Sequence, residues 1–502
     1  MSPSYYRWAF TPLSPIHIGA GEVFEPTQYV VAQGSLCEFD PAALPHVLQE
    51  KDRQELLGIV TSKDSTQMIL AVQRFFAHRK DRLLPVARQR IPLSTGYQEL
   101  YESRIGRIMA NQGADRKIFN RLSIKRVAYR TVDGLPYLPG SSIKGAIRTA
   151  LLHHVNRGQG KQPDDRDGLH SLQSRLLHYR KAQGTSWQLE KDPLRQLRIG
   201  DAIPVPGAIE RRVYQAVNRK KTPLTVRQPD QRAPSERTSP DEYLECVLPQ
   251  NRAFTASVEV QHLTQTLGHR FSGRVPDRSF SVEEIARACN AFYQEEILRQ
   301  ELAEMRERGY VDPAWASAID EFLATNAELM KAGKGFLLRI GHHSGAEAVT
   351  LPGMRKIKIL RKPPSDRATT WWMAAEQGKE QVHQLLPFGW VFVEAQEATG
   401  ENLDWAGRSF AYTVASPDPV PETETSSAVS EPELWEGRIK YRRQNGTLST
   451  VDDHASATGA AAQQLLDSLP KDLQRKLQEN QCFQKFRVTI EDRRIVALEI
   501  LS

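Results

Sequence analysis

Long apolar runs are missing from this 502-residue chain, and cysteine is scarce. No stretch predicts a transmembrane helix, and the N-terminus lacks the basic region and apolar core of a secretory signal. The four cysteines, Cys37, Cys246, Cys289 and Cys482, are widely scattered and form no CxxC pair. This spacing argues against a zinc site and a disulfide framework. We therefore expect reduced, mostly buried thiols and a cytoplasmic location.

The common catalytic signatures are also absent. The chain has no HExxH, no Walker-type glycine loop and no GxSxG elbow. His17 stands beside one glycine turn, and His342 and His343 stand in another. Each could act as a general acid or base, or the His342-His343 pair could bind a metal, but none has a partner evident in the sequence. We therefore expect no catalytic residue, no metal site and no cofactor.

Charge is modest in total but clustered. Hydrophobic residues make up 40% of the chain and charged residues 25%, with a net charge of +7, which is typical of a soluble protein with sizeable cores. Three basic clusters stand near glycine-rich turns: Arg121, Lys125, Arg126 and Arg130; Arg211, Arg212, Arg219, Lys220 and Lys221; and Arg355, Lys356, Lys358, Arg361 and Lys362. One cluster alone usually marks a solvated face, but several beside such turns favour a polyanionic partner.

The most informative segment is residues 135–152, which combines a strand end, a tight turn and a basic helix start. Pro139-Gly140 supplies the turn, and Ser141 or Ser142 can cap the first helical turn. Lys144 and Arg148 are four residues apart and share one face. Free amides, hydroxyls and the helix dipole at this end suit an RNA or nucleotide phosphate. An ordinary capped helix with a solvated basic face is the simpler alternative.

The remaining pattern indicates an α+β fold. Strands are predicted at residues 5–13, 127–129, 335–338, 357–360 and 390–394, and a hairpin at 243–260. Helices are predicted from residue 41, with Asp40 as a cap, and over 282–305 and 313–330. Residues 158–168 and 227–241 are polar and predict mobile loops. Strands and helices interleave without a regular βαβ period, which favours α+β over a doubly wound sheet.

The composition changes near the C-terminus. Residues 415–433 are rich in Pro, Ser, Thr and Glu and predict a linker. The tail then predicts a strand at 434–441, a turn at 444–446, a helix at 461–477 and strands at 483–490 and 494–500. Its Trp, Gly and basic opening strand is similar to OB-type barrels, which bind single strands. A small packing module is an equal alternative.

Six segments, taken in chain order, resemble one protein family. They are residues 13–22, with an opening strand and glycine turn, then 138–151, 192–201, 243–249, 339–345 and 386–390. Together they are similar to the RAMP (repeat-associated mysterious protein) superfamily of CRISPR effector subunits, and most closely to the fifth-subunit family of the type III-A Csm complex. The most specific match is the Leu-Pro-Gly-Ser-Ser-Ile-Lys-Gly-Ala-Ile-Arg-Thr-Ala-Leu run at 138–151.

The resemblance implies a modified RRM-like (ferredoxin-like) core with helical and hairpin insertions. Residues 1–404 would form this crRNA-binding domain, 405–433 a flexible linker and 434–502 a small β-rich, OB-like module that the family typically lacks. Family members stack along a crRNA and grip its backbone without reading its sequence. The fifth subunit ends this filament at the crRNA 3′ side and assists maturation by housekeeping nucleases, whereas a different subunit cuts target RNA.

The implied function is therefore a non-catalytic crRNA-binding subunit in antiviral defence. Its expected partners are crRNA, the other Csm subunits and host nucleases, with no membrane. The residues expected to contact RNA are Ser141, Ser142, Lys144, Arg148, Lys125, Arg126, His17, Gly19, Gly21, Arg339, Gly341, His342, His343 and Gly345. The glycines would let the backbone approach a phosphate closely or adopt positive φ.

Two other functions fit the same residues. The chain could be a metal-independent endoribonuclease that processes crRNA precursors, with His17 or His342 as the base. It could also be a docking scaffold whose basic clusters meet acidic proteins.

Overall fold

The computed structural model describes most of the chain as two compact units, Met1–Val420 and Pro421–Ser502. The described residues are 3–61, 64–107, 120–156, 168–179, 188–207, 209–221, 241–261, 275–359, 362–398, 410–412, 414, 433–442, 447–450, 455–479, 484–491 and 494–501. Nearly all of the two polar loops, most of the expected linker, the 444–446 turn and Cys482 lie outside them. No helix of the described part is long and apolar enough to span a membrane. The domain limits expected above remain a prediction.

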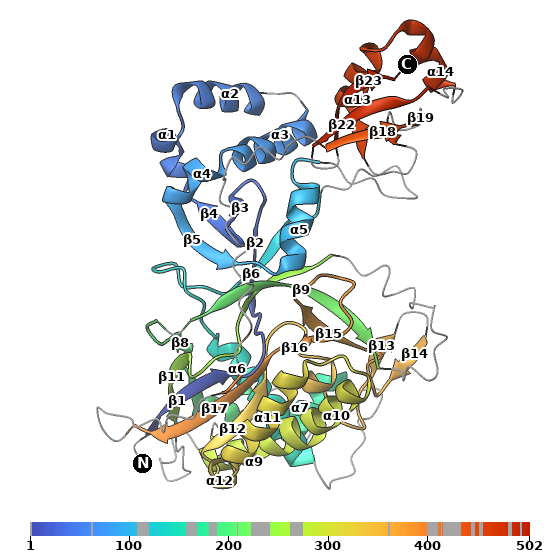
Figure 1. The fold of residues 1–502 in the computed structure, drawn as a ribbon. Coiled ribbons are helices and arrows are strands. Elements are labelled where there is room, and N and C mark those ends of the chain that lie inside the picture. Colours follow the sequence, from blue (N-terminus) through green and yellow to red (C-terminus); the bar gives the residue numbers. More distant parts are fainter. Residues whose placement is uncertain are drawn as a thin grey trace. The chain divides into compact units, whose positions relative to one another are not determined.

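The N-terminal strand lies inside the first sheet of the first unit, at the lower left of Figure 1. The predicted strand at 5–13 is confirmed as β1 (Ser4–Pro12), and it is antiparallel to β11 (Phe254–Val260) and β17 (Trp390–Glu397). The edges are β7 (Leu197–Ile199) and β12 (Gly335–Arg339), both antiparallel to their neighbours, and β8 (Ile203–Pro204) also pairs with β11. Side chains such as Trp8 and Phe10 are fully buried, so this sheet carries the main core.

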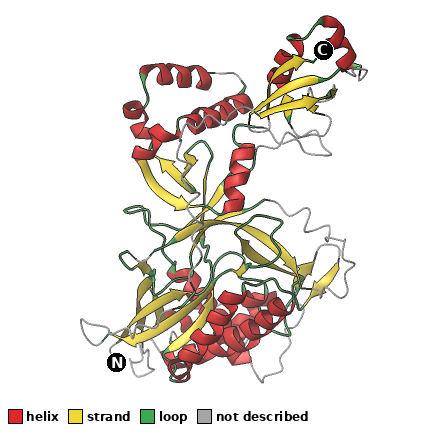
Figure 2. Cartoon of the chain, in the orientation of Figure 1, coloured by secondary structure: helices red, strands yellow, loops and turns green. Residues whose placement is uncertain are grey.

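Helices pack against this sheet. They are α6 (Gly140–Asn156), α7 (Gly168–Leu176), α9 (Val282–Cys289), α10 (Arg299–Glu307), α11 (Pro313–Thr325) and α12 (Ala327–Lys331). The helix expected at 282–305 is confirmed, except that residues Asn290–Leu298 between α9 and α10 are π-helical. Figure 2 shows a cluster of helices beside the strands in the lower part of the view.

The signature helix begins in a different way from the one expected. It starts at Gly140, whose N–H donates to Asp201 Oδ1 at 2.8 Å, so the cap is an acid from a distant loop and not Ser141 or Ser142. A Cβ at Gly140 would lie 2.4 Å from Ile199 O, which explains why glycine stands at this point.

A second sheet holds the basic strands in the order β16-β15-β9-β10-β6-β2. Their bounds are β2 (Gly19–Phe24), β6 (Ile124–Val127), β9 (Arg211–Lys220), β10 (Tyr243–Val247), β15 (Thr370–Ala375) and β16 (Leu386–Pro387). The hairpin expected at 243–260 is wrong, because β10 pairs with β9 and β6 while β11 belongs to the first sheet. The short segment between them carries the chain from one buried sheet to the other.

The first unit also carries a helical insertion. It comprises β3 (Tyr29–Ala32), β4 (Ser35–Phe39), α1 (Leu44–Val47), α2 (Glu50–Val60), α3 (Ser65–His78), α4 (Lys80–Leu83), β5 (Ala87–Pro92) and α5 (Thr95–Arg104). The expected Asp40 cap is present, since its carboxylate accepts from Ala42 N–H at 2.8 Å. A separate hairpin joins β13 (Ile357–Ile359) to β14 (Lys362–Ser365).

In its described residues, the second unit is a single sheet with two helices. Its strands are β18 (Glu433–Gly437), β19 (Ile439–Arg442), β20 (Thr447–Thr450), β21 (Ser456–Thr458), β22 (Phe486–Glu491) and β23 (Arg494–Ile500), in the order β18-β22-β23-β21-β20-β19. The expected helix at 461–477 is two helices, α13 (Gly459–Asp467) and α14 (Lys471–Gln478). Because β18 and β19 are consecutive yet pair at opposite edges, one bent strand closes the sheet on itself. Leu448, Phe486 and Val488 fill its own core.

Candidate nucleic-acid interface

A cavity of about 290 Å³ opens where the first glycine turn, β6 and the loop after β12 meet. It is lined by His17, Gly19, Gly21, Glu22, Val23, Lys125, Arg126 and His342. Most of these residues belong to segments that the sequence analysis selected separately, and the fold brings them together. Glu22 and Val23 were missed, although they directly follow the selected glycines.

Edge strand β2 shapes the mouth of the cavity. Its register against β6 shifts between Gly19 and Val23, so the residues between them bulge out of the ladder. Gly21 has φ +85° and no heavy atom within 4 Å of a Cβ built there, so both its conformation and its surroundings leave the backbone open. Bulges of this kind often adjust backbone direction beside binding sites. Residues 19–23 are exposed, so this turn is accessible to a ligand.

His17 ties the cavity to the second glycine loop. Its ring Nδ1 hydrogen-bonds to Glu245 O at 2.7 Å, and its own carbonyl accepts the His342 backbone N–H at 2.7 Å. Gly341 has φ +88°, and a Cβ there would lie 2.4 Å from that carbonyl oxygen. Only glycine permits this approach, which explains one glycine of the late loop.

The His17 ring is neutral at physiological pH. Burial lowers its pKa to about 4, and the hydrogen bond to the Glu245 carbonyl only partly offsets this effect. A carbonyl accepts hydrogen bonds, so the proton lies on Nδ1 and Nε2 carries a lone pair. His17 can therefore accept a hydrogen bond or a proton, but it does not offer a positive charge to a phosphate.

The two basic side chains of β6, Lys125 and Arg126, differ in how far they are exposed to solvent. Arg126 is only 13% exposed, lies 3.8 Å from the centre of the Tyr129 ring and faces Glu38 at 3.4 Å. Lys125 is 47% exposed and forms an ion pair with Glu242. Lys125 is thus the accessible ammonium of the cavity, and Arg126 is held in place by packing.

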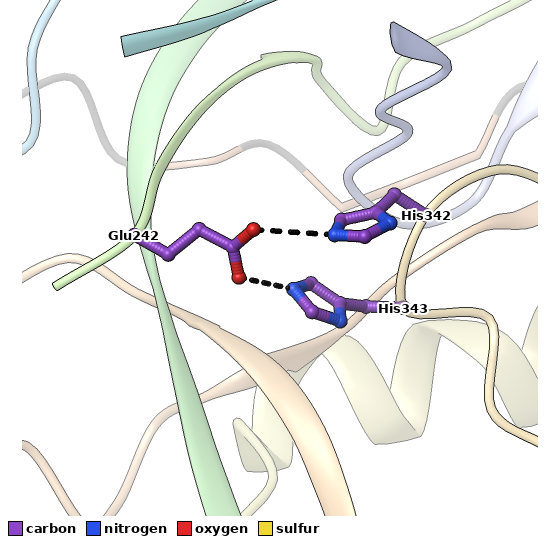
Figure 3. A group of neighbouring side chains, drawn as sticks. All are labelled: Glu242, His342 and His343. Atoms are coloured by element: carbon purple, nitrogen blue, oxygen red, sulfur yellow. Dashed lines mark hydrogen bonds and ion pairs between the residues drawn. The ribbon is translucent and has the colours of Figure 1, made fainter. Parts of the chain in front are cut away.

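A carboxylate and two imidazoles meet beside the cavity (Figure 3). Glu242, just before β10, contacts His342 Nε2 at 3.2 Å through Oε1 and His343 Nε2 at 2.8 Å through Oε2. Partial burial favours the neutral acid, but bonds from His342, His343 and Lys125 outweigh it and hold the pKa of Glu242 well below its usual range. The sequence analysis missed Glu242, because one acid before a strand resembles many others.

His343 is fixed unusually firmly for a loop residue. Its φ is +61°, a left-handed value that residues with a side chain seldom adopt. Its ring stacks on Trp372, with centroids 4.5 Å apart and an interplanar angle of 13°. Burial lowers the pKa of His343, which the Glu242 carboxylate partly opposes.

The residues of the signature helix lie outside the cavity lining. Lys144 Nζ donates to Leu197 O at 2.8 Å, and burial lowers its pKa. Arg148 forms an ion pair with Asp192. Ser141 is exposed and Ser142 half-buried in the first helical turn. The predicted RNA contacts on α6 are thus separate from those that line the cavity.

Arg339 and three side chains of the second basic cluster, on and beside β9, are buried. Arg339 is 2% exposed, and its guanidinium donates to Glu301 at 2.5 Å and to Phe388 O at 3.1 Å. Gly345 lies against that guanidinium, with its Cβ position 3.4 Å from Nη1. On and beside β9, Arg212, Arg219 and Lys221 are also buried. These three side chains therefore offer no surface to a polyanion, and Lys221, for example, pairs with the buried carboxylate of Glu347.

These features define a mixed α/β protein whose glycine turns frame a small cavity. The family model of the RAMP superfamily matches residues 9–342, and the chain belongs to this superfamily. Among curated proteins no relative matches. The fold is similar to the crystal structure of Csm5 from T. onnurineus, with 17% identity and a TM-score of 0.43, covering 76% of this chain and 99% of that chain. It is also similar to a chain of the Csm-crRNA-target RNA ternary complex of a type III-A CRISPR-Cas system, with 18% identity, a TM-score of 0.40 and coverage of 78% and 100%.

Proposed function

We propose that this RAMP protein is a crRNA-binding subunit of a type III-A Csm complex, of the Csm5 type, that ends the subunit filament at the crRNA 3′ side. It would be non-catalytic, act in the cytoplasm in antiviral defence, and contact other Csm subunits and the nucleases that mature crRNA. The family membership supports the class, and the ordered motifs support the subunit type. The observation that carries the RNA role is the convergence of both glycine turns and Lys125 on one cavity.

The strand order supports an RRM-like core for residues 1–404. Strands β17, β1, β11 and β7 lie side by side and antiparallel, with α6 between β1 and β7 in the chain and α9 to α12 between β11 and β17. This is the 4-1-3-2 arrangement of a βαββαβ unit, to which β12 adds an edge. A parallel β21–β23 pair and helices between β21 and β22 support an OB-type barrel for the second unit.

The backbone of an RNA would follow the open edge of β2. Gly19 and Gly21 would let phosphates approach the main-chain amides, and Lys125 would turn from Glu242 toward a phosphate. Ser141, Ser142, Lys144 and Arg148 would provide a second set of contacts on α6. Arg339 is left out of this set because its charge is already satisfied inside the protein. Such contacts give affinity without reading sequence.

The test is binding of labelled crRNA by fluorescence anisotropy over a salt series, with the integrity of the RNA checked on a gel. We expect Lys125→Ala to weaken binding and to reduce the slope of log affinity against log salt by about 1, because one phosphate contact is lost. The control is Lys331→Ala, an exposed lysine on α12 that is 72% exposed and paired with Glu328. Equal binding by Lys125→Ala and wild type would remove the cavity from the proposal.

The same assay distinguishes a second candidate function, an endoribonuclease, from RNA binding alone. His17 borders the cavity as a neutral imidazole with a free Nε2, which is the state that a general base requires. Metal-independent cutting of repeat precursor, lost in His17→Ala, would replace the binding role with an endoribonuclease. Binding to partner subunits but to no RNA would instead favour a docking scaffold.

A further inference from the structure

We propose that Glu242, His342 and His343 form a binding site for a divalent transition metal of the zinc or cobalt kind, at the edge of the cavity. The three ligand atoms lie within 4.8 Å of one another and come from two loops far apart in the chain. The inference does not depend on RNA binding, because metal binding is measured on the protein alone.

The ligand set selects the class of metal. Two imidazole nitrogens and one carboxylate suit Zn²⁺, Co²⁺ or Ni²⁺, whereas Mg²⁺ and Ca²⁺ prefer oxygen ligands throughout. In the structure both Nε2 atoms face oxygens of the same carboxylate, at 3.2 Å from His342 and 2.8 Å from His343 (Figure 3). A metal would enter between these atoms and replace the shared hydrogens. Three protein ligands leave one coordination position for water or another ligand.

The fold fixes two of the ligands, His342 and His343, in place without a metal. Trp372 stacks on His343, and the ring of Phe388 lies 5.6 Å from it on a buried strand end. The backbone of His342 is fixed through the 2.7 Å hydrogen bond to His17 O. Ligands whose orientation is set by packing bind metal without a large loss of conformational freedom. The left-handed φ of His343 is a conformation that a functional site often retains.

Access to the site is open on one side. The side chain of His342 is 44% exposed, whereas those of Glu242 and His343 are 14% and 9% exposed. His342 also lines the cavity, so an ion can enter from solvent through it. A phosphate oxygen in the cavity could take the open coordination position, which would link the metal to the proposed function.

Lys125 competes with a metal ion for Glu242, which gives the proposal a specific test. Its ammonium pairs with the same Oε1 of Glu242 that His342 contacts, so it competes with a metal for this carboxylate. A divalent ion would repel Lys125, and this half-exposed side chain can turn away into solvent or the cavity. Removal of the lysine should therefore strengthen metal binding. A purely structural ion cluster would show no such gain.

The experiment is calorimetric titration of the full-length protein with ZnCl₂ after removal of metal by a chelator, with Co²⁺ absorption as a second readout. We expect saturable binding near one ion per chain, weakened about tenfold or more in His343→Ala and in Glu242→Gln, and strengthened in Lys125→Ala. The matched control is His46→Ala, an exposed histidine of α1, which should bind as wild type does. Melting curves of each variant confirm folding.

Three results would count against the inference. One is the absence of saturable Zn²⁺ or Co²⁺ binding by the wild type. Another is unchanged affinity in a His342→Ala/His343→Ala variant, which would assign the ion to other histidines. The Lys125 side chain is partly exposed, so the Lys125→Ala variant should fold. Unchanged or weaker metal binding in this variant would also count against the site. RNA binding in the presence of EDTA remains a separate measurement of the proposed function.

Discussion

At the scale of single residues, His17 predicts a pH-dependent stability. Its pKa is lowered from 6.5 to about 4 in the folded protein, so between these values the unfolded state binds more protons. The free energy of unfolding should therefore fall as the pH drops through this window, by about 3 kcal/mol for a shift of this size. His17→Asn keeps a donor near the position of Nδ1 but does not titrate, so the variant lacks this loss.

Urea unfolding of wild type and His17→Asn at several pH values from neutral to acid checks this prediction. The two stability curves should converge or cross as the pH falls, since only wild type must place a neutral imidazole in the core. Curves that stay parallel would mean that His17 is protonated, or exposed, in the folded state.

Charge alone did not reveal which basic residues face solvent. Arg339 and Lys125 look alike in the sequence, yet Arg339 is buried against Glu301 and Lys125 is 47% exposed. The acids that decide between the two cases, Glu301 and Glu242, lie far from them in the chain. The glycines were better guides, because positive φ or close backbone approach is a local demand, as at Gly21 and Gly341.

At the scale of elements, two glycines of α6 predict opposite effects. A Cβ at Gly140 would lie 2.4 Å from Ile199 O, so Gly140→Ala should destabilise the protein by about 1–3 kcal/mol. Gly145 lies inside the same helix with no heavy atom within 4 Å of its Cβ position, so Gly145→Ala should stabilise it by about 0.5–1 kcal/mol. Urea unfolding of both variants gives the measurement, and shifts of the same sign would contradict this placement of the helix.

Element patterns were predictable where they were local. The alternation of β1 and the turn before α6 are present in short windows of sequence, and both elements appear where expected. The separation of β10 and β11 into different sheets was not predictable, because two adjacent strands joined by a short loop usually pair with each other. Here each strand finds a longer-range partner, and no local signal distinguishes the two cases. The capping of α6 by Asp201 likewise depends on a contact between residues far apart in the chain.

At the scale of the whole molecule, the two units should unfold separately. Each has its own core, with Leu337 fully buried in the first and Leu448 in the second. The composition change near the linker indicated such a division, although only folding shows which residues fill each core. For residues 421–502 we expect a calorimetric transition of about 60 kcal/mol, from about 0.7 kcal/mol per residue.

Scanning calorimetry of the full chain with one core variant in each unit tests this division. Leu448→Ala should lower the melting temperature of the smaller transition alone, and Leu337→Ala that of the larger, since each deletes buried methyl groups worth about 2–5 kcal/mol. If either variant shifted both transitions equally, the units would fold as one cooperative body. In that case removal of the C-terminal unit would also disturb the cavity and the Glu242 cluster. Separate transitions would let the RNA-binding and metal-binding measurements be assigned to the first unit without that interference.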